Sequence, residues 1–463
     1  MAFTLRPYQQ QAVDACIDFI QNSTAKNGLV VAPTAAGKSL IVANVARALG
    51  QKVLCLQPSK ELLEQNYAKY VSYGEEASLF SASVGVKEIG SVTFATPRSV
   101  FNSLEEFKEA GVNYIIVDEC HLQTKVNSQM HKVVKQLKPR KVIGLTATPI
   151  FLTSYMGQSI LRMMNRTAKS FFKKIIHITQ IQDLVEKKFW SPLIYENRYI
   201  DDSMLMLNSN GSDYTSNSLL RMFEVNNTSA HIEEEVERLI EEGRKSILVF
   251  VPSIEAAEHL ASKVADSAAV SSKTPKGQRN KIIKGFKDGS IKVIFNVLVL
   301  SVGFDHPELD AIIHARPTNS MAIYYQTLGR GVRIAPTKKD CKIVDLAGNS
   351  VKFGKIEDLN FEDIEGYGWG MFANERLVTG IPMSEGLAMS KEDLKEKRTR
   401  DDSPSRVFMP FGKYRGESVE KVWQKDKNYL MWIASDKFEP HDTNTNNFKF
   451  NVCNFVTMKL FAV

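Results

Sequence analysis

The chain has 463 residues, of which 43% are hydrophobic and 24% are charged, a composition typical of a globular protein with roughly two to four domains. No apolar run approaches the ~20 residues that span a bilayer, and MAFTLRPYQQ lacks the pattern of a secretion signal, so we expect a cytoplasmic protein without a membrane partner. Five widely spaced cysteines form no CxxC pair, so neither a zinc ribbon nor a disulfide framework is indicated, and a net charge of +7 permits a nucleic-acid partner without requiring one.

The first third of the chain alternates short β-rich runs with amphipathic stretches. Apolar residues recur at helical spacing in SLIVANVARAL and SKELLEQNYAKYV, which predicts helices between the runs. Buried strands that alternate with helices favour a parallel sheet. The predicted strands are 28–32 (GLVVA), 52–57 (KVLCLQ), 91–96 (SVTFAT), 114–119 (YIIVDE) and 141–148 (KVIGLTAT).

The pattern fades from about residue 150 to 235 and then returns in SILVFV, KVIFNV, AIIHA and KIVDLA. Residues 389–406 are dense in charge and indicate an exposed linker before a short final module. We therefore predict an α/β protein with two tandem parallel-sheet domains, a middle insertion and a small C-terminal accessory module. The predicted limits are 1–152, 153–235 for the connecting segment, 236–350, 351–406 for the extension and charged linker, and 407–463.

The stretch VVAPTAAGKSL places Gly-Lys-Ser between a predicted strand and a predicted helix. Free N–H groups and the dipole at a helix N-terminus favour an anion there. Lys38 can reach the β- and γ-phosphates of a nucleotide, the Ser39 hydroxyl can bind Mg²⁺, and Gly37 lets the backbone approach the phosphates. Ala32 and Ala35 keep the loop slim, but we expect them to exclude a turn that requires glycine at those two positions.

An acidic pair follows a later predicted strand, in YIIVDECH. Asp118 and Glu119 stand at the carboxyl end of that strand, the edge of an open parallel sheet where ligands collect. There Asp118 can hold Mg²⁺, and Glu119 can orient or deprotonate an attacking water. Two solvated carboxylates would give the same local sequence, but the Gly-Lys-Ser loop makes a nucleotide site the favoured interpretation.

Short motifs along the chain resemble those of superfamily 2 helicases and translocases, most closely the phage and bacterial DNA-repair helicases of the RadD and UvsW type. The resemblance covers roughly residues 3–350 and implies two tandem RecA-like domains. The motifs are LRPYQQQAV (5–13), APTAAGKS (32–39), PSKELLEQ (58–65), TPRS (96–99), DECH (118–121), TATP (146–149), VFVPSIEAAEHL (249–260), NVLVLSVGFDHPELDAII (296–313) and YYQTLGRGVR (324–333).

This resemblance implies an ATP- and Mg²⁺-dependent site shared between the two domains, with Ser39 and Asp118 as the Mg²⁺ ligands. Ala35 stands where the family usually has glycine. The implied catalytic residues are Lys38, Asp118, Glu119, Gln326, Arg330 and Arg333. The implied nucleotide contacts are Arg6, Gln9, Pro33, Thr34, Ala35, Ala36, Gly37, Lys38, Ser39, Gly303 and Asp305.

Coupling and nucleic-acid residues follow from the same resemblance. His121 is expected to couple the nucleotide site to Thr146 or Thr148, with a plain cap of the strand end as the alternative. The implied nucleic-acid contacts are Pro58, Ser59, Gln65, Thr96, Arg98, Pro252, Ser253 and Asn296. Each taken alone is more typical of a helix cap or turn, and Asn296 stands where relatives often have threonine.

The middle segment leaves two interpretations open. Residues 161–190 are basic and contain Phe171, Phe172, Phe189 and Trp190. They suit contact with a single strand or fork, or an amphipathic helix packed on the first domain, which we favour slightly. The following LVEKKFWSPLIY resembles the strand that leads RadD-like proteins from the first domain into the second.

The final module, 408–438, resembles a small domain at the tails of some bacterial and phage exonucleases. One interpretation is a stacking platform that contains Lys413 and Tyr414, with Phe411 and Arg415 beside them. The other is a compact hydrophobic fold with glycine turns at 412 and 416. It carries no acidic cluster for two metal ions, so nuclease activity is not predicted.

The sequence therefore predicts an ATP-dependent DNA helicase or translocase that moves 3′ to 5′ by resemblance. It would act on single-stranded and branched or forked DNA in replication, recombination or repair, beside recombination or replication proteins, in a bacterial cell or phage-infected host. Three alternatives stay open: an RNA helicase, a double-strand DNA translocase subunit of a restriction or defence complex, and a nucleic-acid-binding scaffold without turnover. The intact Lys38, Glu119 and Arg330 argue against the scaffold.

Overall fold

The chain forms two compact units, Met1–Ala388 and Met389–Val463, in a computed structural model. The structure describes residues 3–123, 128–155, 158–166, 170–198, 201–209, 212–301, 304–364, 368–374, 376–380, 389–390, 409, 412–414, 417, 419–435, 438, 449, 452–453 and 456. The longest helix described, α1 (Pro7–Asn22), has 16 residues. A bilayer requires ~20, so none of the described helices can be a membrane span.

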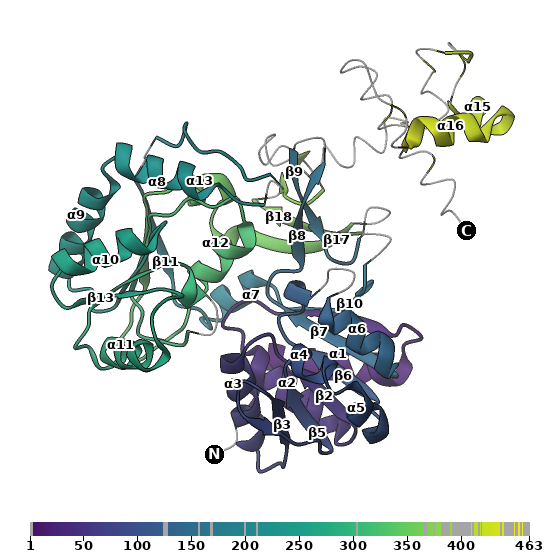
Figure 1. Ribbon diagram of the computed structural model, residues 1–463, viewed down its shortest axis with the longest axis horizontal. Helices are drawn as coiled ribbons and strands as arrows, with labels where there is room; N and C mark the ends of the chain where they lie inside the picture. Colours follow the sequence, from purple (N-terminus) through teal and green to yellow (C-terminus); the bar gives the residue numbers. More distant parts are fainter. Residues whose placement is uncertain are drawn as a thin grey trace. The chain divides into compact units, whose positions relative to one another are not determined.

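The first lobe is built on an eight-stranded sheet of order β10-β1-β7-β6-β2-β5-β3-β4 (Figure 1). Neighbouring strands are parallel except for β3 and β4. Its strands are β1 (Asn27–Val31), β2 (Val53–Leu56), β3 (Ser78–Ser81), β4 (Val86–Lys87), β5 (Val92–Ala95), β6 (Tyr114–Val117), β7 (Lys141–Thr146) and β10 (Lys174–Ile178). The five strands predicted for this part of the chain are confirmed as β1, β2, β5, β6 and β7.

Helices of the first lobe form two layers, because α2 contacts both α1 and α3, while α4, α5 and α6 contact one another. The helices after α1 are α2 (Lys38–Leu49), α3 (Lys60–Val71), α4 (Pro97–Phe101), α5 (Leu104–Ala110), the 3₁₀ turn η1 (Cys120–Gln123), α6 (Gln129–Leu137) and α7 (Ile181–Glu186). The central strands are therefore buried, which explains their uninterrupted Val, Ile and Leu runs.

The second lobe contains a six-stranded parallel sheet of order β11-β16-β15-β12-β14-β13. Its strands are β11 (Leu193–Asn197), β12 (Ile247–Phe250), β13 (Ser267–Val270), β14 (Val293–Asn296), β15 (Ala311–His314) and β16 (Cys341–Asp345). Its helices are α8 (Ser216–Val225), α9 (Thr228–Glu241), α10 (Ile254–Lys263), α11 (Lys276–Asp288), η2 (Val299–Ser301), α12 (Met321–Leu328) and α13 (Asn349–Phe353). The protein is thus an α/β protein of two tandem RecA-like domains, as predicted.

The connecting segment extends both sheets. After an antiparallel hairpin, β8 (Ile150–Tyr155) and β9 (Gln158–Met163), strand β10 adds to β1 of the first lobe. Strand β11 then pairs with β16 of the second lobe. The favoured amphipathic helix over 161–190 is wrong where KIIHI forms β10, because an edge strand there satisfies backbone hydrogen bonds along β1.

The aromatic residues of this segment pack inside the protein. Phe172 and Trp190 are buried in the core, and Phe171 contacts Phe172 edge to face. Phe189 packs against Tyr8. These positions favour the packing interpretation over a single-strand platform.

After the second lobe, the chain runs back to the first lobe and packs against α7. The turn η3 (Ile356–Asp358) leads into an antiparallel ribbon of β17 (Leu359–Ile364), β18 (Gly368–Ala373) and β19 (Arg376–Leu377). The Gln180 side chain donates to the carbonyl of Phe361 at 2.6 Å and accepts from its N–H at 3.0 Å. Gln182 donates to the carbonyls of Glu357 and Leu359. The chain segments entering and leaving the second lobe are thereby joined.

The second unit contains β20 (Met389–Ser390), α15 (Val419–Lys425) and α16 (Lys427–Ala434). A small core includes Val422 and Leu430. Of the expected platform residues, Lys413 forms an ion pair with Asp426 at 2.7 Å and Tyr414 donates to the same carboxylate at 3.0 Å. Phe411 and Arg415 lie outside the described residues, as does Gly416, while Gly412 adopts a left-handed turn with φ +75°.

Gly144 of β7 provides a test of packing in the first lobe. A Cβ at Gly144 would lie 2.5 Å from the Phe172 ring and 2.8 Å from the Cys120 sulfur. Overpacking a core typically costs about 1–3 kcal/mol, so we expect Gly144→Ala to lower the free energy of unfolding by this amount in chemical denaturation. Gly277→Ala on α11, where a Cβ meets nothing within 4 Å, is the control. Equal stability of the two variants would contradict the packing described.

Candidate functional site

A cavity of about 240 Å³ lies at the carboxyl edge of the first sheet and brings residues of both lobes together. The first lobe contributes the loop after β1, the end of β6 and one face of α3. The second lobe contributes the loop after α12 and the segment after η2. The lining residues are Thr34, Ala35, Gly37, Lys38, Ser39, Leu40, Leu62, Gln65, Lys69, Asp118, Glu119, Asp305, Arg330 and Arg333.

The loop after β1 has the backbone of a phosphate cradle. Gly37 is the N-cap of α2 and has φ +82°, so the helix N-terminus opens into the cavity. A Cβ at Gly37 would lie 2.4 Å from the Gln9 side-chain nitrogen. Ala35 has φ +61°, in the left-handed region. The expectation that alanine excludes a glycine-type turn at that position is therefore wrong, because the surrounding loop holds Ala35 in this conformation at a cost of about 1–2 kcal/mol.

The N-terminal turn of α1 and its N-cap pack on the same loop. Gln9 donates to the carbonyl of Ala36 at 2.8 Å and accepts from the Arg6 N–H at 2.9 Å. The Tyr8 hydroxyl donates to the same Ala36 carbonyl at 3.1 Å. The Arg6 guanidinium lies 4.5 Å from the centre of the Phe189 ring. Arg6 and Gln9 thus lie against the loop, together with Pro33 and Ala36, which are both buried.

The acidic pair faces the lysine of this loop. Lys38 Nζ lies 3.3 Å from a Glu119 carboxylate oxygen. Burial raises the pKa of Glu119, but the charge of Lys38 and its hydrogen bond to Glu119 outweigh that effect and hold this pKa below the usual range. Asp118 is 3% exposed, and burial together with the neighbouring Glu119 raises its pKa to about 6. Glu119 therefore loses its proton at a lower pH than Asp118.

Asn66 is a site residue that sequence reasoning missed. Its side chain, 0% exposed, donates from α3 to Asp118 Oδ2 at 2.8 Å. Leu62, Leu63 and Tyr70 share the buried face of this helix. An asparagine on such a face requires a polar partner, and this is the signal that could have identified it.

The residues present fit a magnesium nucleotide. Asp118 is a buried carboxyl whose pKa is raised by burial and by the neighbouring Glu119, and Ser39 lines the same cavity. Carboxylate and hydroxyl oxygens are the ligands that Mg²⁺ prefers. Bound there, Mg²⁺ would neutralise negative charge on the phosphates. Lys38 and the N-terminus of α2 would bind the phosphates themselves.

Two arginines enter the cavity from the second lobe. Arg330 is 8% exposed and donates to the Phe304 carbonyl at 2.8 Å, and burial lowers its pKa to about 10. Arg333 donates to the same carbonyl at 3.3 Å and forms a short ion pair with Asp305. Gly303 lies outside the described residues.

The two lobes touch beside these arginines. A Cβ at Gly329 would lie 2.4 Å from Thr34 Cγ2, so the loop after α12 lies directly on the phosphate loop. Gln326 lies 3.2 Å from His121 across the same boundary. Gly331, on the other side of Arg330, approaches Cys341, whose sulfur would lie 2.6 Å from an added Cβ. The glycines that flank Arg330 therefore allow close backbone approaches on both sides.

His121 contacts the residues that the coupling hypothesis named. His121 Nδ1 lies 2.8 Å from the Thr146 hydroxyl, which also accepts from the Thr148 N–H at 3.0 Å. Burial lowers the pKa of His121, which favours the neutral ring. With the proton on Nδ1, the ring donates to Thr146 and accepts from the Gln326 amide, so one histidine joins both lobes.

Most of the expected nucleic-acid residues lie at carboxyl edges of the two sheets. Pro58 and Ser59 follow β2, Thr96 and exposed Arg98 follow the adjacent β5, and Pro252 and Ser253 follow β12. Ser59 and Ser253 also cap α3 and α10 by accepting from N–H groups.

Two of these expectations require correction. Gln65 lines the nucleotide cavity, because its place on α3 turns it toward the phosphate loop. Asn296 is 0% exposed, donates to the Val249 carbonyl and accepts from the Leu300 N–H. Its side chain therefore holds the turn after β14 and is not accessible to a strand.

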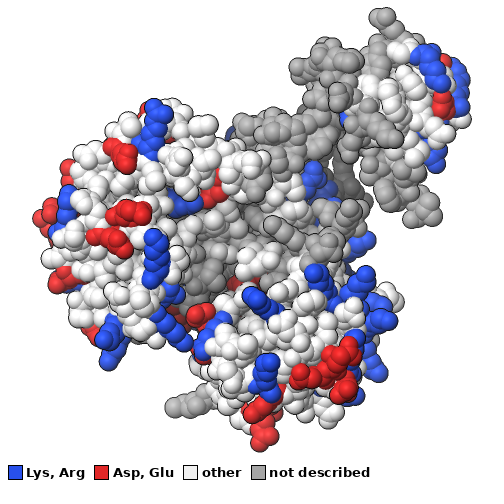
Figure 2. All heavy atoms as spheres, viewed as in Figure 1, with Lys and Arg blue, Asp and Glu red and all other residues white. Residues whose placement is uncertain are grey.

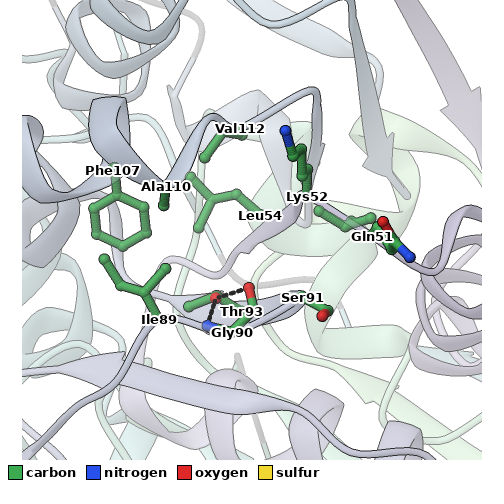
Figure 3. A pocket seen from close by; sticks show the side chains of 11 residues that line it. Gln51, Lys52, Leu54, Ile89, Gly90, Ser91, Thr93, Phe107, Ala110 and Val112 are labelled. Carbon is green, nitrogen blue, oxygen red and sulfur yellow. Dashed lines mark hydrogen bonds between the residues drawn. The ribbon is translucent and has the colours of Figure 1, made fainter.

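A further cavity of about 280 Å³ lies at the opposite, amino edge of the first sheet (Figure 3). Phe107, Ile89 and Leu54 form its apolar wall, with Lys52 at one side. The Thr93 hydroxyl is bonded to the backbone of Gly90, as the dashed lines show. The cavity lined by Lys38, Glu119 and Arg330 lies instead at the carboxyl edge, where ligands bind to open parallel sheets.

Comparison with known proteins gives two family matches. The family described as "Type III restriction enzyme, res subunit" matches residues 2–151, and "Helicase conserved C-terminal domain" matches residues 231–335. These ranges cover the phosphate loop and acidic pair in the first lobe and both arginines in the second.

Individual relatives are distant. The chain is 26% identical over 86% of its length to the putative ATP-dependent helicase IRC3 of Saccharomyces cerevisiae, of which it covers 58%. It is 25% identical over 74% of its length to the putative DNA 3′-5′ helicase Rad25 of Haloarcula marismortui, of which it covers 52%. The chain thus spans little more than half the length of these relatives. A solved fragment of a putative HsdR subunit of a type I restriction enzyme from Vibrio vulnificus is 20% identical, with a TM-score of 0.59, over 76% of this chain and 65% of that chain.

Ala35 offers a test of the loop geometry. Ala35→Gly removes the left-handed strain of about 1–2 kcal/mol but adds about 0.4–1 kcal/mol of chain entropy to the unfolded state. We expect the free energy of unfolding to rise by up to about 1.5 kcal/mol, with nucleotide affinity retained. The adjacent Ala36→Gly, outside the left-handed region, should be destabilised in the same chemical denaturation. A loss of stability for Ala35→Gly as large as for Ala36→Gly would argue against this geometry.

Gly329 tests the contact between the lobes. Its φ is −60°, so alanine fits the backbone, and only the approach to Thr34 forbids a Cβ. Because misplacement by about 1 Å can cost on the order of 10²-fold in rate, we expect Gly329→Ala to lower the turnover number for ATP by up to that factor. The thermal midpoint should stay near that of Gly277→Ala. Normal turnover in Gly329→Ala would show that hydrolysis does not require this contact.

Proposed function

Because the chain belongs to superfamily 2 of the helicases and translocases, we propose that it is an ATP-dependent DNA helicase or translocase. The observation that carries this proposal is the shared cavity, in which Lys38 and Glu119 of one lobe face Arg330 and Arg333 of the other. The closer likeness to RadD- and UvsW-type proteins remains a prediction.

The arrangement supports hydrolysis that depends on closure of the lobes. Glu119, whose pKa is held low, is suited to orient or deprotonate the attacking water. Lys38 lies within 3.3 Å of Glu119 and would exchange this partner for the terminal phosphates. Arg330 is positioned to stabilise charge on the transferring phosphoryl group, as an arginine supplied across a cleft does. Gln326 and His121 link the lobes beside this point.

Closure and reopening of the two lobes would displace them relative to each other and so move the protein along a nucleic-acid strand. Ser59 caps the N-terminus of α3. On the same helix, Gln65 lines the cavity and Asn66 donates to Asp118. A strand bound at the carboxyl edges would thereby contact the same helix that faces the nucleotide. Hinge closure around a ligand is a common way to convert binding into displacement.

The second lobe offers further groups for a phosphate backbone. Beside Ser253, a cavity of about 520 Å³ is lined by Ser271, Lys273 and Thr274. Helix α11 carries Lys276, Arg279, Lys281, Lys284 and Lys287. On the face in Figure 2, basic and acidic side chains are interspersed over both lobes. Local Lys, Ser and Thr groups of this kind can bind a phosphate backbone without sequence preference.

Finer aspects of function are proposals as well. We place the protein in the cytoplasm of a bacterial cell or phage-infected host, moving 3′ to 5′ on forked or branched DNA with recombination or replication proteins as partners. Four cysteines of the described part of the chain are buried and free, which suits a reducing compartment. The name of Rad25 includes 3′-5′ polarity.

A second candidate is a double-strand DNA translocase of a restriction or defence complex. The match to the restriction-enzyme family over the first lobe and the likeness to HsdR favour it. A helicase should displace a labelled strand from a fork, whereas such a translocase should hydrolyse ATP on duplex DNA without displacement. A panel of forks and three- and four-way junctions, with DNA and RNA strands and with and without ATP, distinguishes these functions from an RNA helicase.

Glu119→Gln tests the proposed function directly. Loss of the general base should lower the turnover number for ATP in the presence of single-stranded DNA by on the order of 10²–10⁴-fold. Nucleotide affinity should change little, because Lys38 and the loop remain. Glu105→Gln, at an exposed position of α5, is the matched control. Wild-type ATP hydrolysis that no nucleic acid stimulates would overturn the proposal, as would full activity of Glu119→Gln.

A further inference from the structure

The loop that carries both arginines has no regular structure of its own. It leaves α12 at Gly329 and extends through Arg333 as turns. The Thr34 side chain packs against the loop at Gly329, and the Cys341 side chain packs against it at Gly331. These contacts limit where the loop can go, but they do not set the direction in which its carbonyls and side chains point.

Three successive carbonyls of this loop accept hydrogen bonds from outside it. Lys338 Nζ donates to the Gly331 carbonyl at 2.5 Å and to the Arg333 carbonyl at 2.9 Å. The Ser191 N–H donates to the Val332 carbonyl between them at 2.8 Å. One ammonium thus bridges two carbonyls on either side of Val332 and fixes the curvature of the backbone between the arginines.

Lys338 is suited to this role by its surroundings. It is half-buried in the segment before β16, where its N–H also bonds to the Ala335 carbonyl. Burial lowers its pKa, while the carboxylates of Asp310 and Glu308 act in the opposite direction. An ammonium offers three donors on a compact head, so one side chain can serve both carbonyls.

We propose that Lys338 is a positioning residue for ATP hydrolysis: it holds the backbone at Gly331 and Arg333 so that Arg330 and Arg333 project into the nucleotide cavity. The proposal rests on the proposed function, because the arginines act on a phosphoryl group. Lys338 does not line the cavity and is not itself expected to contact nucleotide.

A positioning role and a merely structural role predict different results. If Lys338 acts through the arginines, its loss weakens binding of a transition-state mimic and leaves ground-state affinity intact, because transition-state interactions are those that accelerate the reaction. If Lys338 only stabilises the fold, its loss lowers the thermal midpoint and the active fraction, and both affinities of the folded fraction stay unchanged.

The test uses the full chain with Lys338→Met, with single-stranded DNA present, and measures affinity for ADP and for ADP with aluminium fluoride. We expect affinity for the fluoride complex and the turnover number each to fall on the order of tenfold, from the lost hydrogen bonds, with ADP affinity within about twofold. Lys339→Met, at the exposed neighbouring position, should match the wild type. Should Lys338→Met fail to fold, Lys338→Ala, which also lacks a donor, takes its place.

A double-mutant cycle completes the test. In an Arg330→Ala, Arg333→Ala background, Lys338→Met should cause less than about a twofold further loss of affinity for the fluoride complex, because coupled residues are not additive. A full tenfold further loss would overturn the proposal, as would equal losses for ADP and its fluoride complex, or no loss in either. If nucleic acid does not stimulate ATP hydrolysis by the wild type, the proposed function is wrong. The affinities for ADP and for ADP with aluminium fluoride still decide the role of Lys338.

Discussion

The site depends on the approach of the Gly329 backbone to the Thr34 side chain. Lys38 and Glu119 lie on the first lobe, and Arg330 lies on the second, so they share a cavity only when the lobes touch. A residue with a side chain at 329 would hold the two surfaces apart. The absence of a Cβ at one position therefore determines whether the charged groups can act together.

Electrostatics explains why the assembled cavity is suited to an anion. Lys38 is paired with Glu119, and burial lowers the pKa of Arg330 to about 10. Taking a guanidinium out of water is costly, and a negative phosphate group beside it would offset that cost. Burial and the neighbouring Glu119 raise the pKa of Asp118 to about 6. A cation bound beside Asp118 would favour its ionised form.

The segments on either side of the second lobe determine how the two lobes can move. Gln180 and Gln182 bond to the backbone that leaves the second lobe, and Tyr195 donates to Glu357 at 2.7 Å. Ser191 bonds to the loop of the arginines. The two lobes are thus connected by two chain segments that are bonded to each other, and one of these segments contacts the loop that carries Arg330 and Arg333. Motion of the second lobe must either pivot about this pair or break its hydrogen bonds.

Sequence alone determined the two parallel sheets and the positions of Gly37, Lys38 and Asp118, because strand patterns and phosphate loops are local properties of adjacent residues. Only the tertiary structure decided that Gln65 faces the nucleotide cavity, that Asn66 supports Asp118, and that KIIHI completes the first sheet. Each of these depends on contact between segments far apart in the chain. Side-chain bonds to nearby backbone, such as those of Lys338 to the carbonyls of Gly331 and Arg333, also follow no periodicity in the sequence, because they depend on how the loop folds back on itself.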